Sequence, residues 1–268
     1  MNWEPAHADH SIDHVILLAT LERPLDLDNF DEMVVAVRKS ANSHGFLHRL
    51  DQQEPIQIPA APAAFGNGQS MMLLDDTLRR RVVYRQIAEN AVIGEFSIGA
   101  QSISLTTSRY RRWANFFDTF VDLFQTLDNA AQILSKTKSV RLQYVDRFRS
   151  LPGGGDHFEL LSRSSPYIVE AVKQVDAAFH VHSGWFDLRE PGVRKLTNVN
   201  VDVTDLSGPV PPDMRRQLTI LCMGQDEALV GNLSSPIDRA GALHIDLKNL
   251  FGNIITEGAA TRVSLNLG

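Results

Sequence analysis

The sequence predicts an α+β fold of two similar halves, each a mostly antiparallel sheet packed by one long amphipathic helix. Apolar side chains recur at three- and four-residue spacings over 113–127 and again over 240–254, which is the period of a helix face. Short strand-like runs precede both stretches. Three adjacent glycines, 153–155, lie between them and are poorly accommodated inside an element. We therefore expect an N-terminal half, 1–150, a C-terminal half, 151–268, and an internal duplication.

The N-terminal half opens with a polar arm and the continuously apolar run 15–21, which predicts a strand covered on both faces. Asp28 is the expected N-cap of a helix that Gly45 ends, and residues 46–50 predict a short strand. Prolines and glycines over 52–68 are tolerated by neither a helix nor a central strand, so this segment is expected to be a long loop. A short strand over 71–74 follows it.

Runs that alternate or contain strand-forming residues predict an antiparallel meander over 79–87, 91–98 and 102–106. A helix is then expected from Ser108, with its apolar stripe facing a core. The run 140–148 predicts a strand in which Val140, Leu142 and Tyr144 share one face.

The C-terminal half repeats this order of strands before a helix. The expected elements are a short helix over 166–178, strands over 179–188, 195–204, 216–222 and 227–233, a helix opened by Pro236 and stopped by Gly258, and a last strand over 261–267.

Composition excludes several classes of protein. A net charge of -6 and a pI near 5.8 argue against a whole-chain binder of nucleic acid or membrane surfaces, although a local basic patch stays open. The single Cys222 excludes an intramolecular disulfide and a multi-cysteine zinc site, and its apolar surroundings predict an inert core thiol. The first residues lack a secretory signal and no apolar run approaches the ~18 residues of a membrane helix, so a cytoplasmic location is expected.

Three motifs resemble those of a sporadically distributed family of uncharacterised bacterial proteins of roughly this length. They are Ser108-x-Tyr110-x-x-Trp113-x-x-Phe116, Arg141-Leu142-Gln143-Tyr144-Val145-Asp146-Arg147, and His244-x-x-Leu247-x-x-x-Phe251-x-x-Ile254-Ile255-Thr256. The N-terminal strand and helix resemble those of the family as well. Gln143 stands where that family has Arg, and Asp146 where it has Asn. The resemblance implies a shared fold and no particular reaction, and some members of the family lie near mobile-element or phage-defence genes.

Histidines are the candidate metal ligands and catalytic groups. His180 and His182 lie on one predicted strand, where a period of two places both imidazoles on one face, as metal sites often require. A third ligand would have to come from Asp187, His157 or elsewhere in the chain, and the alternative is two half-exposed histidines. His244 adjoins the apolar stripe of the second long helix, which favours a hydrogen-bonded core histidine. The alternative for His244 is a general base or ligand in a cleft between the halves.

Arginines cluster in two stretches and are the candidate binding residues: Arg79, Arg80, Arg81, Arg109, Arg111 and Arg112. Such density is typical of a face that recognises phosphates or acids, and the alternative is a solvated surface. The second group lies at the expected start of a helix, where the helix dipole disfavours cations unless an anion offsets it. This position favours the binding interpretation.

The expected function is a non-catalytic protein-binding module, in a bacterial defence or toxin-control operon, that uses loop 52–68 and the Arg-rich face as contacts. A metal- or histidine-dependent enzyme built on His180, His182 and His244 is the alternative, and nucleic-acid binding through the Arg-rich face ranks below it. The expected partner is a protein, and a homo-oligomer is compatible with the sequence. Neither a cofactor nor a membrane is indicated.

Overall fold

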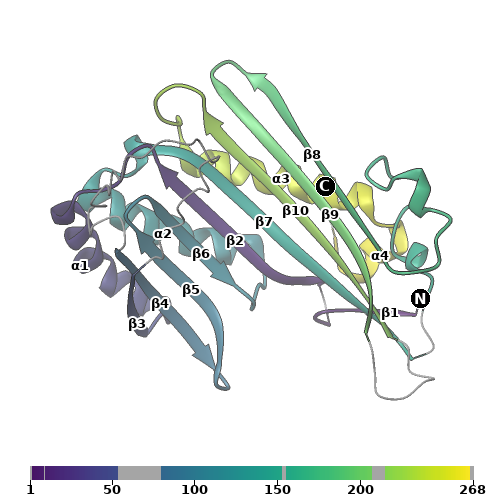
Figure 1. Cartoon of the computed structure of the whole chain (residues 1–268). Coiled ribbons are helices and arrows are strands. Elements are labelled where there is room, and N and C mark those ends of the chain that lie inside the picture. Colours follow the sequence, from purple (N-terminus) through teal and green to yellow (C-terminus); the bar gives the residue numbers. More distant parts are fainter. Residues whose placement is uncertain (1, 9, 54–79, 153–154, 207–214, 266–268) are drawn as a thin grey trace, which may run out of the picture.

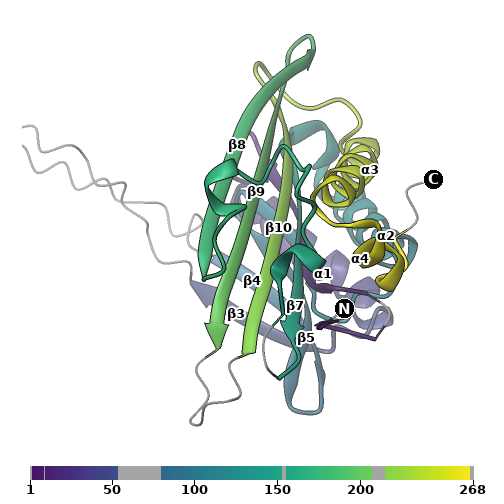
Figure 2. The same ribbon diagram turned by 90° about the vertical axis from the view of Figure 1, so that its right-hand side faces the viewer.

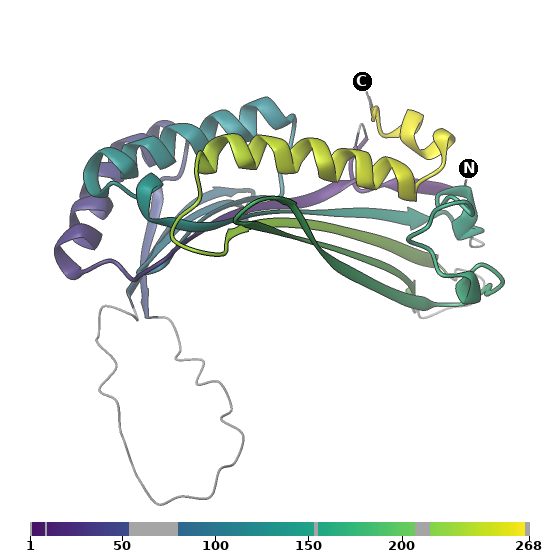
Figure 3. The same ribbon diagram turned by 90° about the horizontal axis from the view of Figure 1, so that it is seen from above.

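The described part of the chain forms one antiparallel sheet of ten strands with helices on one side. The computed structural model describes residues 2–8, 10–53, 80–152, 155–206 and 215–265. All α-helices of this part lie on one face of the sheet (Figures 1 and 3), and the opposite face carries none of them. The α+β class is therefore confirmed. No helix among the described residues is both long and apolar enough to cross a membrane.

The strands, in chain order, are β1 (Trp3–Pro5), β2 (Ile12–Leu21), β3 (His48–Gln53), β4 (Arg80–Ala88), β5 (Ala91–Gly99), β6 (Ser102–Thr107), β7 (Thr137–Ser150), β8 (Phe179–Glu190), β9 (Val193–Leu206) and β10 (Arg215–Ala228). The α-helices are α1 (Leu27–Ser43), α2 (Trp113–Ala131), α3 (Pro236–Ile254) and α4 (Glu257–Arg262). Single 3-10 turns are η2 (Leu134–Lys136), η3 (His157–Glu159) and η4 (Glu170–Val172).

One sheet runs through both predicted halves. Its strand order is β3-β4-β5-β6-β2-β7-β10-β9-β8, with β1 paired to the end of β7. The junction is the pairing of β7 with β10, which continues from Arg149↔Gln217 to Ser139↔Glu227. The prediction that each half would form a sheet of its own is wrong, because β7 uses one edge for β2 and the other for β10.

The C-terminal half also departs from the expected repeat. The predicted last strand over 261–267 is wrong for residues 261–265, which are the end of α4 and the turn after it, and residues 266 and 267 lie outside the described residues. Thr256 caps α4 by accepting a hydrogen bond from the Ala259 N–H at 3.2 Å. Of the expected strand over 227–233, only residues 227 and 228 are in a strand, as the last two residues of β10. The expected helix over 166–178 consists of turns around η4. The similarity of the two halves is thus not shown.

The first long helix begins later than its sequence predicts. The Ser108 N–H donates to the Ile93 carbonyl at 2.9 Å, which keeps this residue alongside β5. Arg112 has extended backbone angles and is the N-cap of α2. Arg109, Arg111 and Arg112 therefore precede the helix. Of the expected stripe, Phe116, Phe120, Phe124 and Leu127 are buried, together with Leu123 and Ala131. The other three expected residues, Trp113, Phe117 and Val121, are half-buried against the core.

Strand β2 is covered on one face only. Val15, Leu17 and Ala19 are buried, whereas the intervening Ile16 and Leu18 are half-buried. The expectation of cover on both faces is wrong, because an antiparallel sheet can leave one face to solvent and here the helices take the other.

The rest of the N-terminal half follows its prediction closely. The meander is present as β4, β5 and β6. Helix α1 buries the expected face, but its N-cap is Asp26, whose carboxylate accepts the Asn29 N–H at 2.8 Å. Apart from residues 52 and 53, which belong to β3, the predicted loop 52–68 lies outside the described residues, as does the predicted strand 71–74.

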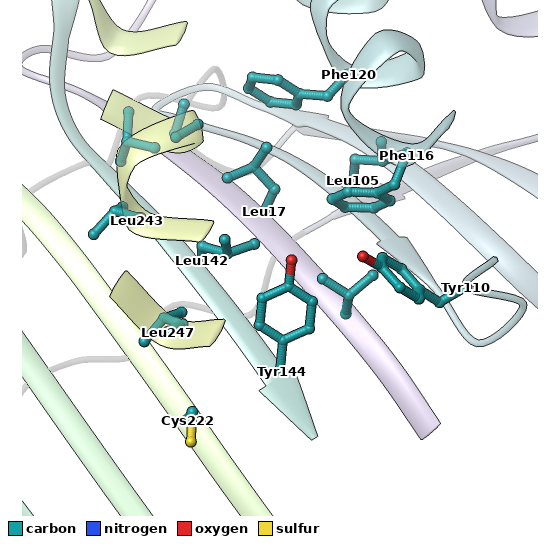
Figure 4. Packing of buried hydrophobic residues seen from close by; sticks show 14 of the residues in the cluster. Leu17, Leu105, Tyr110, Phe116, Phe120, Leu142, Tyr144, Cys222, Leu243 and Leu247 are labelled. Atoms are coloured by element: carbon teal, nitrogen blue, oxygen red, sulfur yellow. The ribbon is translucent and has the colours of Figure 1, made fainter. Parts of the chain in front are cut away.

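Helix α3 lies close against β7 and β10 (Figure 2). Gly224 of β10 permits this approach, because a Cβ there would lie only 3.0 Å from Leu243 Cδ2. The packing places the same side of α3, including Leu247, over Tyr144 and Cys222 (Figure 4). Helix α3 thus covers one face of β7 and β10.

Candidate functional site

A cavity of about 250 Å³ lies on the helix-covered face, where six separate segments meet. Its walls come from the start of β2, the residues just before α2, the middle of β7 and β10, one side of α3, and the turn after α4. These segments are far apart in the sequence. The site therefore exists only in the folded chain.

Aromatic side chains form one wall. The imidazole of His244 stacks on the indole of Trp113, with ring centroids 4.3 Å apart and planes 7° from parallel. The Tyr144 hydroxyl lies 2.9 Å from His244 Nδ1. Tyr110 meets Tyr144 edge to face at 6.0 Å, and both rings lie on the helix-covered side of the sheet (Figure 4). The two tyrosines and His244 form a continuous polar chain within an otherwise apolar wall.

Burial determines the protonation states of His244, Tyr144 and Tyr110. Burial, with a smaller contribution from the Lys248 charge, lowers the pKa of His244 to about 4, so the imidazole is neutral at pH 7. Nδ1 then accepts from the Tyr144 hydroxyl in the tautomer that carries its proton on Nε2. Burial raises the pKa of Tyr110 to about 12 and that of Tyr144 well above its ordinary range. Both hydroxyls therefore remain protonated donors.

Asp146 forms the inner polar wall and is only 3% exposed. Ser11 Oγ donates to its Oδ1 at 2.6 Å. Burial raises the pKa of this carboxyl to about 7, and the hydrogen bond from Ser11 acts in the opposite direction. The carboxyl is therefore about half ionised at neutral pH. Strongly shifted pKa values cluster at functional sites, so this shift makes Asp146 a candidate functional residue.

The alternation of β7 explains how a carboxyl comes to lie there. Val140, Leu142, Tyr144, Asp146 and Phe148 all face the helices, as the period of two requires. An acid in the middle of a buried apolar face is the sequence signal for this site. Sequence reasoning noted Asp146 only as a departure from a family pattern and assigned it no role.

Three cations line the cavity: Arg111, Arg112 and Lys248. Both arginines are exposed and the lysine is half-buried, and none of the three forms an ion pair with the residues that the structure describes. Helix α2 begins beside them without a side-chain cap and without an acid in its first turn. Its positive end therefore adds to the cationic character of the opening.

The other predicted arginines lie elsewhere. Arg109 is 3.5 Å from Glu89. Arg80 pairs with Asp31 at 2.9 Å, whereas Arg81 reaches Ser97 at 3.1 Å. Arg79 is outside the described residues. The structure thus divides the predicted Arg-rich face, and only Arg111 and Arg112 of its described members join the cavity.

The predicted histidines are likewise separated. His180 and His182 alternate with the buried Val181 and so point to the open face of the sheet, where His180 hydrogen bonds to Asp202. His244 lies on the helix-covered face. These three histidines therefore do not converge, and the prediction of a shared site, which the enzyme hypothesis required, is wrong. The described residues contain no group of three or more His, Cys, Asp or Glu that could hold a metal ion.

The two predicted third ligands do not complete a site with His180 and His182 either. His157 is buried with its ring 5.1 Å from that of Phe179. Asp187 shares the parity of Val181 on β8 and so faces the opposite side of the sheet from both histidines. The sequence alone could not show these orientations relative to the helices.

Cys222 lines the cavity as a buried residue, and burial raises the pKa of its thiol well above the ordinary range. It is therefore a protonated, weakly reactive group, in agreement with the expected core thiol. The cavity as a whole combines hydrogen-bond donors, one buried carboxyl and three cations around an apolar volume. Comparison of the chain with models of known families and with curated proteins found no match to either.

Proposed function

We propose that this protein is a non-catalytic binding module and that the cavity is its recognition site for an apolar group that carries an anion. The observation that supports the proposal most is the combination of apolar walls with Arg111, Arg112 and Lys248, which have no acidic partner among the described residues. Partly apolar pockets with a few convergent polar groups are the usual form of a ligand site. A segment of a partner protein is the proposed source of the ligand.

The size of the cavity supports a small occupant. Its volume of about 250 Å³ lies just below the ~300–1,000 Å³ of pockets for drug-sized ligands. A single side chain of a partner, or a free molecule of similar size, fits that volume. Membership of the bacterial family that the motifs resemble, and a place in a defence or toxin-control operon, stay predictions.

Hexanoate is a suitable first probe because it has one carboxylate and an apolar chain and little else. We expect isothermal titration calorimetry to show binding to the wild-type protein and a loss of that binding in the double variant R111Q/R112Q. The matched control is R109Q, which removes a neighbouring cation outside the cavity lining. A control that weakens binding as much as the double variant would show only a general charge effect and would overturn the proposal.

One observation favours a second candidate function, acid–base catalysis. Asp146, with a pKa of about 7, lines the same cavity as the neutral His244, and a group that titrates near neutrality is suited to proton transfer. Incubation of bound probe compounds with the wild-type protein and with D146N, followed by ¹H NMR, tests this candidate. Turnover that is lost in D146N would favour catalysis, whereas compounds recovered unchanged would favour the binding module.

A further inference from the structure

We infer that the ligand of this cavity carries an ammonium group at the end of an apolar stem, that Asp146 binds the ammonium, and that the cations at the opening bind an anion at its other end. This inference rests on the proposed function and adds the identity of the buried end of the ligand. A lysine side chain flanked by acidic residues has this chemistry, and so does a free ω-amino acid.

The buried carboxyl of Asp146 lacks a countercharge in the described part of the chain. Its hydrogen-bond partner there is the neutral Ser11. Burial raises the pKa of this carboxyl and the hydrogen bond from Ser11 lowers it, and none of the described arginines and lysines contributes to the shift. A buried carboxylate without a cation is costly, because the low-dielectric surroundings do not replace the lost hydration. A ligand ammonium would offset that cost.

The opening of the cavity has the reverse charge imbalance. Arg111, Arg112 and Lys248 have no acidic partner among the described residues, although they lie on the same cavity. An acid inside and cations outside define a direction for a ligand with two opposite charges. A simple anion would satisfy the opening alone, and a simple amine would satisfy Asp146 while it is repelled by the cations.

The volume between these two ends is lined mostly by aromatic and aliphatic side chains. Its walls include Tyr110, Trp113 and Tyr144 from one side and Leu247 and Phe251 from α3. An alkyl stem packs well on such a surface, and an ammonium is attracted to the faces of aromatic rings. The neutral imidazole of His244 adds no repulsion. These walls suit a stem of the kind that a lysine side chain has.

Three small probes separate the two charged groups: 6-aminohexanoate has both, hexanoate lacks the ammonium, and hexylamine lacks the carboxylate. We expect 6-aminohexanoate to bind the wild-type protein about tenfold or more tighter than hexanoate, since a hydrogen-bonded charge pair is typically worth that factor. D146N is expected to bind 6-aminohexanoate no tighter than hexanoate. D118N is the matched control, because Asp118 is an exposed acid of α2 outside the cavity lining.

The outcomes separate the two proposals. Equal binding of hexanoate and 6-aminohexanoate to the wild-type protein would overturn the inference and leave the proposed function standing. Absence of binding for both would overturn the proposed function and the inference with it. This comparison uses the wild-type protein and so does not depend on whether D146N folds. An equal loss of preference in D118N and D146N would also refute the role of Asp146.

Two capped peptides identify the source of the ammonium. The sequence Asp-Lys-Asp presents a lysine between acids, and its Nε-acetyl-lysine counterpart has the same shape without the charge. Tighter binding of the first peptide than of both 6-aminohexanoate and the acetylated peptide would support a lysine of a partner protein. Binding of 6-aminohexanoate without binding of the peptide would support a free ω-amino acid instead.

Discussion

Replacement of Asp146 by asparagine is expected to change the way in which the stability of the fold depends on pH. The carboxyl has an ordinary pKa of 3.8 in an unfolded chain, whereas burial raises it to about 7 in the folded protein. Between these values the unfolded chain has released the proton and the folded protein still holds it. The free energy of unfolding therefore falls as pH rises through this window.

The magnitude follows from the two pKa values. Each pH unit inside the window costs about 1.4 kcal/mol, so the wild-type protein loses about 2 kcal/mol by pH 5 and about 4 kcal/mol by pH 8, relative to strongly acidic solution. The amide side chain of D146N does not titrate and can still accept the hydrogen bond of Ser11. D146N is therefore expected to gain about 2–3 kcal/mol on the wild-type protein between pH 5 and pH 8.

Urea denaturation of both proteins at the two pH values measures this difference. All other titrating groups are common to the two proteins, so their contributions cancel in the comparison. Parallel pH dependences for wild type and D146N would refute the reasoning, because they would mean that the Asp146 carboxyl is no harder to ionise in the folded protein than in the unfolded chain.

Four further variants test the packing of the core and the placement of His180. G224V should lower the free energy of unfolding in urea by about 1–3 kcal/mol, because its Cβ would crowd Leu243. The control G241A on α3 adds a Cβ that meets nothing within 4 Å and should raise this free energy by up to about 1 kcal/mol. A change of the same sign in both variants would contradict the close approach of α3 to β10. F120A should cost about 3–5 kcal/mol because this ring is buried, and a calorimetric loss below about 1 kcal/mol would place it outside the core. H180A should leave hexanoate binding unchanged within about twofold and stability within about 0.5 kcal/mol, since His180 lies on the open face; a clear loss of binding would contradict that placement.

Local patterns predicted much of this fold because they record which side of an element meets the core. The meander appeared where strand-like runs and turn residues predicted it. The apolar stripes of α1, α2 and α3 are the faces that the structure buries. In the N-terminal half the errors lie at the ends of elements, as at α1, where the N-cap is Asp26. In the C-terminal half the element type itself was wrong twice, at α4 and over residues 166–178.

The candidate site was harder to predict because its parts meet only in three dimensions. Arg111, Arg112 and His244 were identified as candidates for separate reasons, and the structure places them on one cavity. Asp146 was visible as an acid within an apolar alternation. Its role could not be inferred from the sequence, because the role depends on the hydrogen bond from Ser11, which lies just before β2, and on the absence of a nearby cation in the described residues.

The sequence by itself determined the class of the fold, the position of most elements and the buried side of α1, α3 and β7, because a period of two or 3.6 is a local property of the chain. The tertiary structure alone decided that one sheet joins both halves, since the edge of β7 that pairs with β10 has no local signature. It also decided that His180 and His244 lie on opposite faces of that sheet. The cavity, with an acid inside and cations at its opening, is likewise a product of long-range packing.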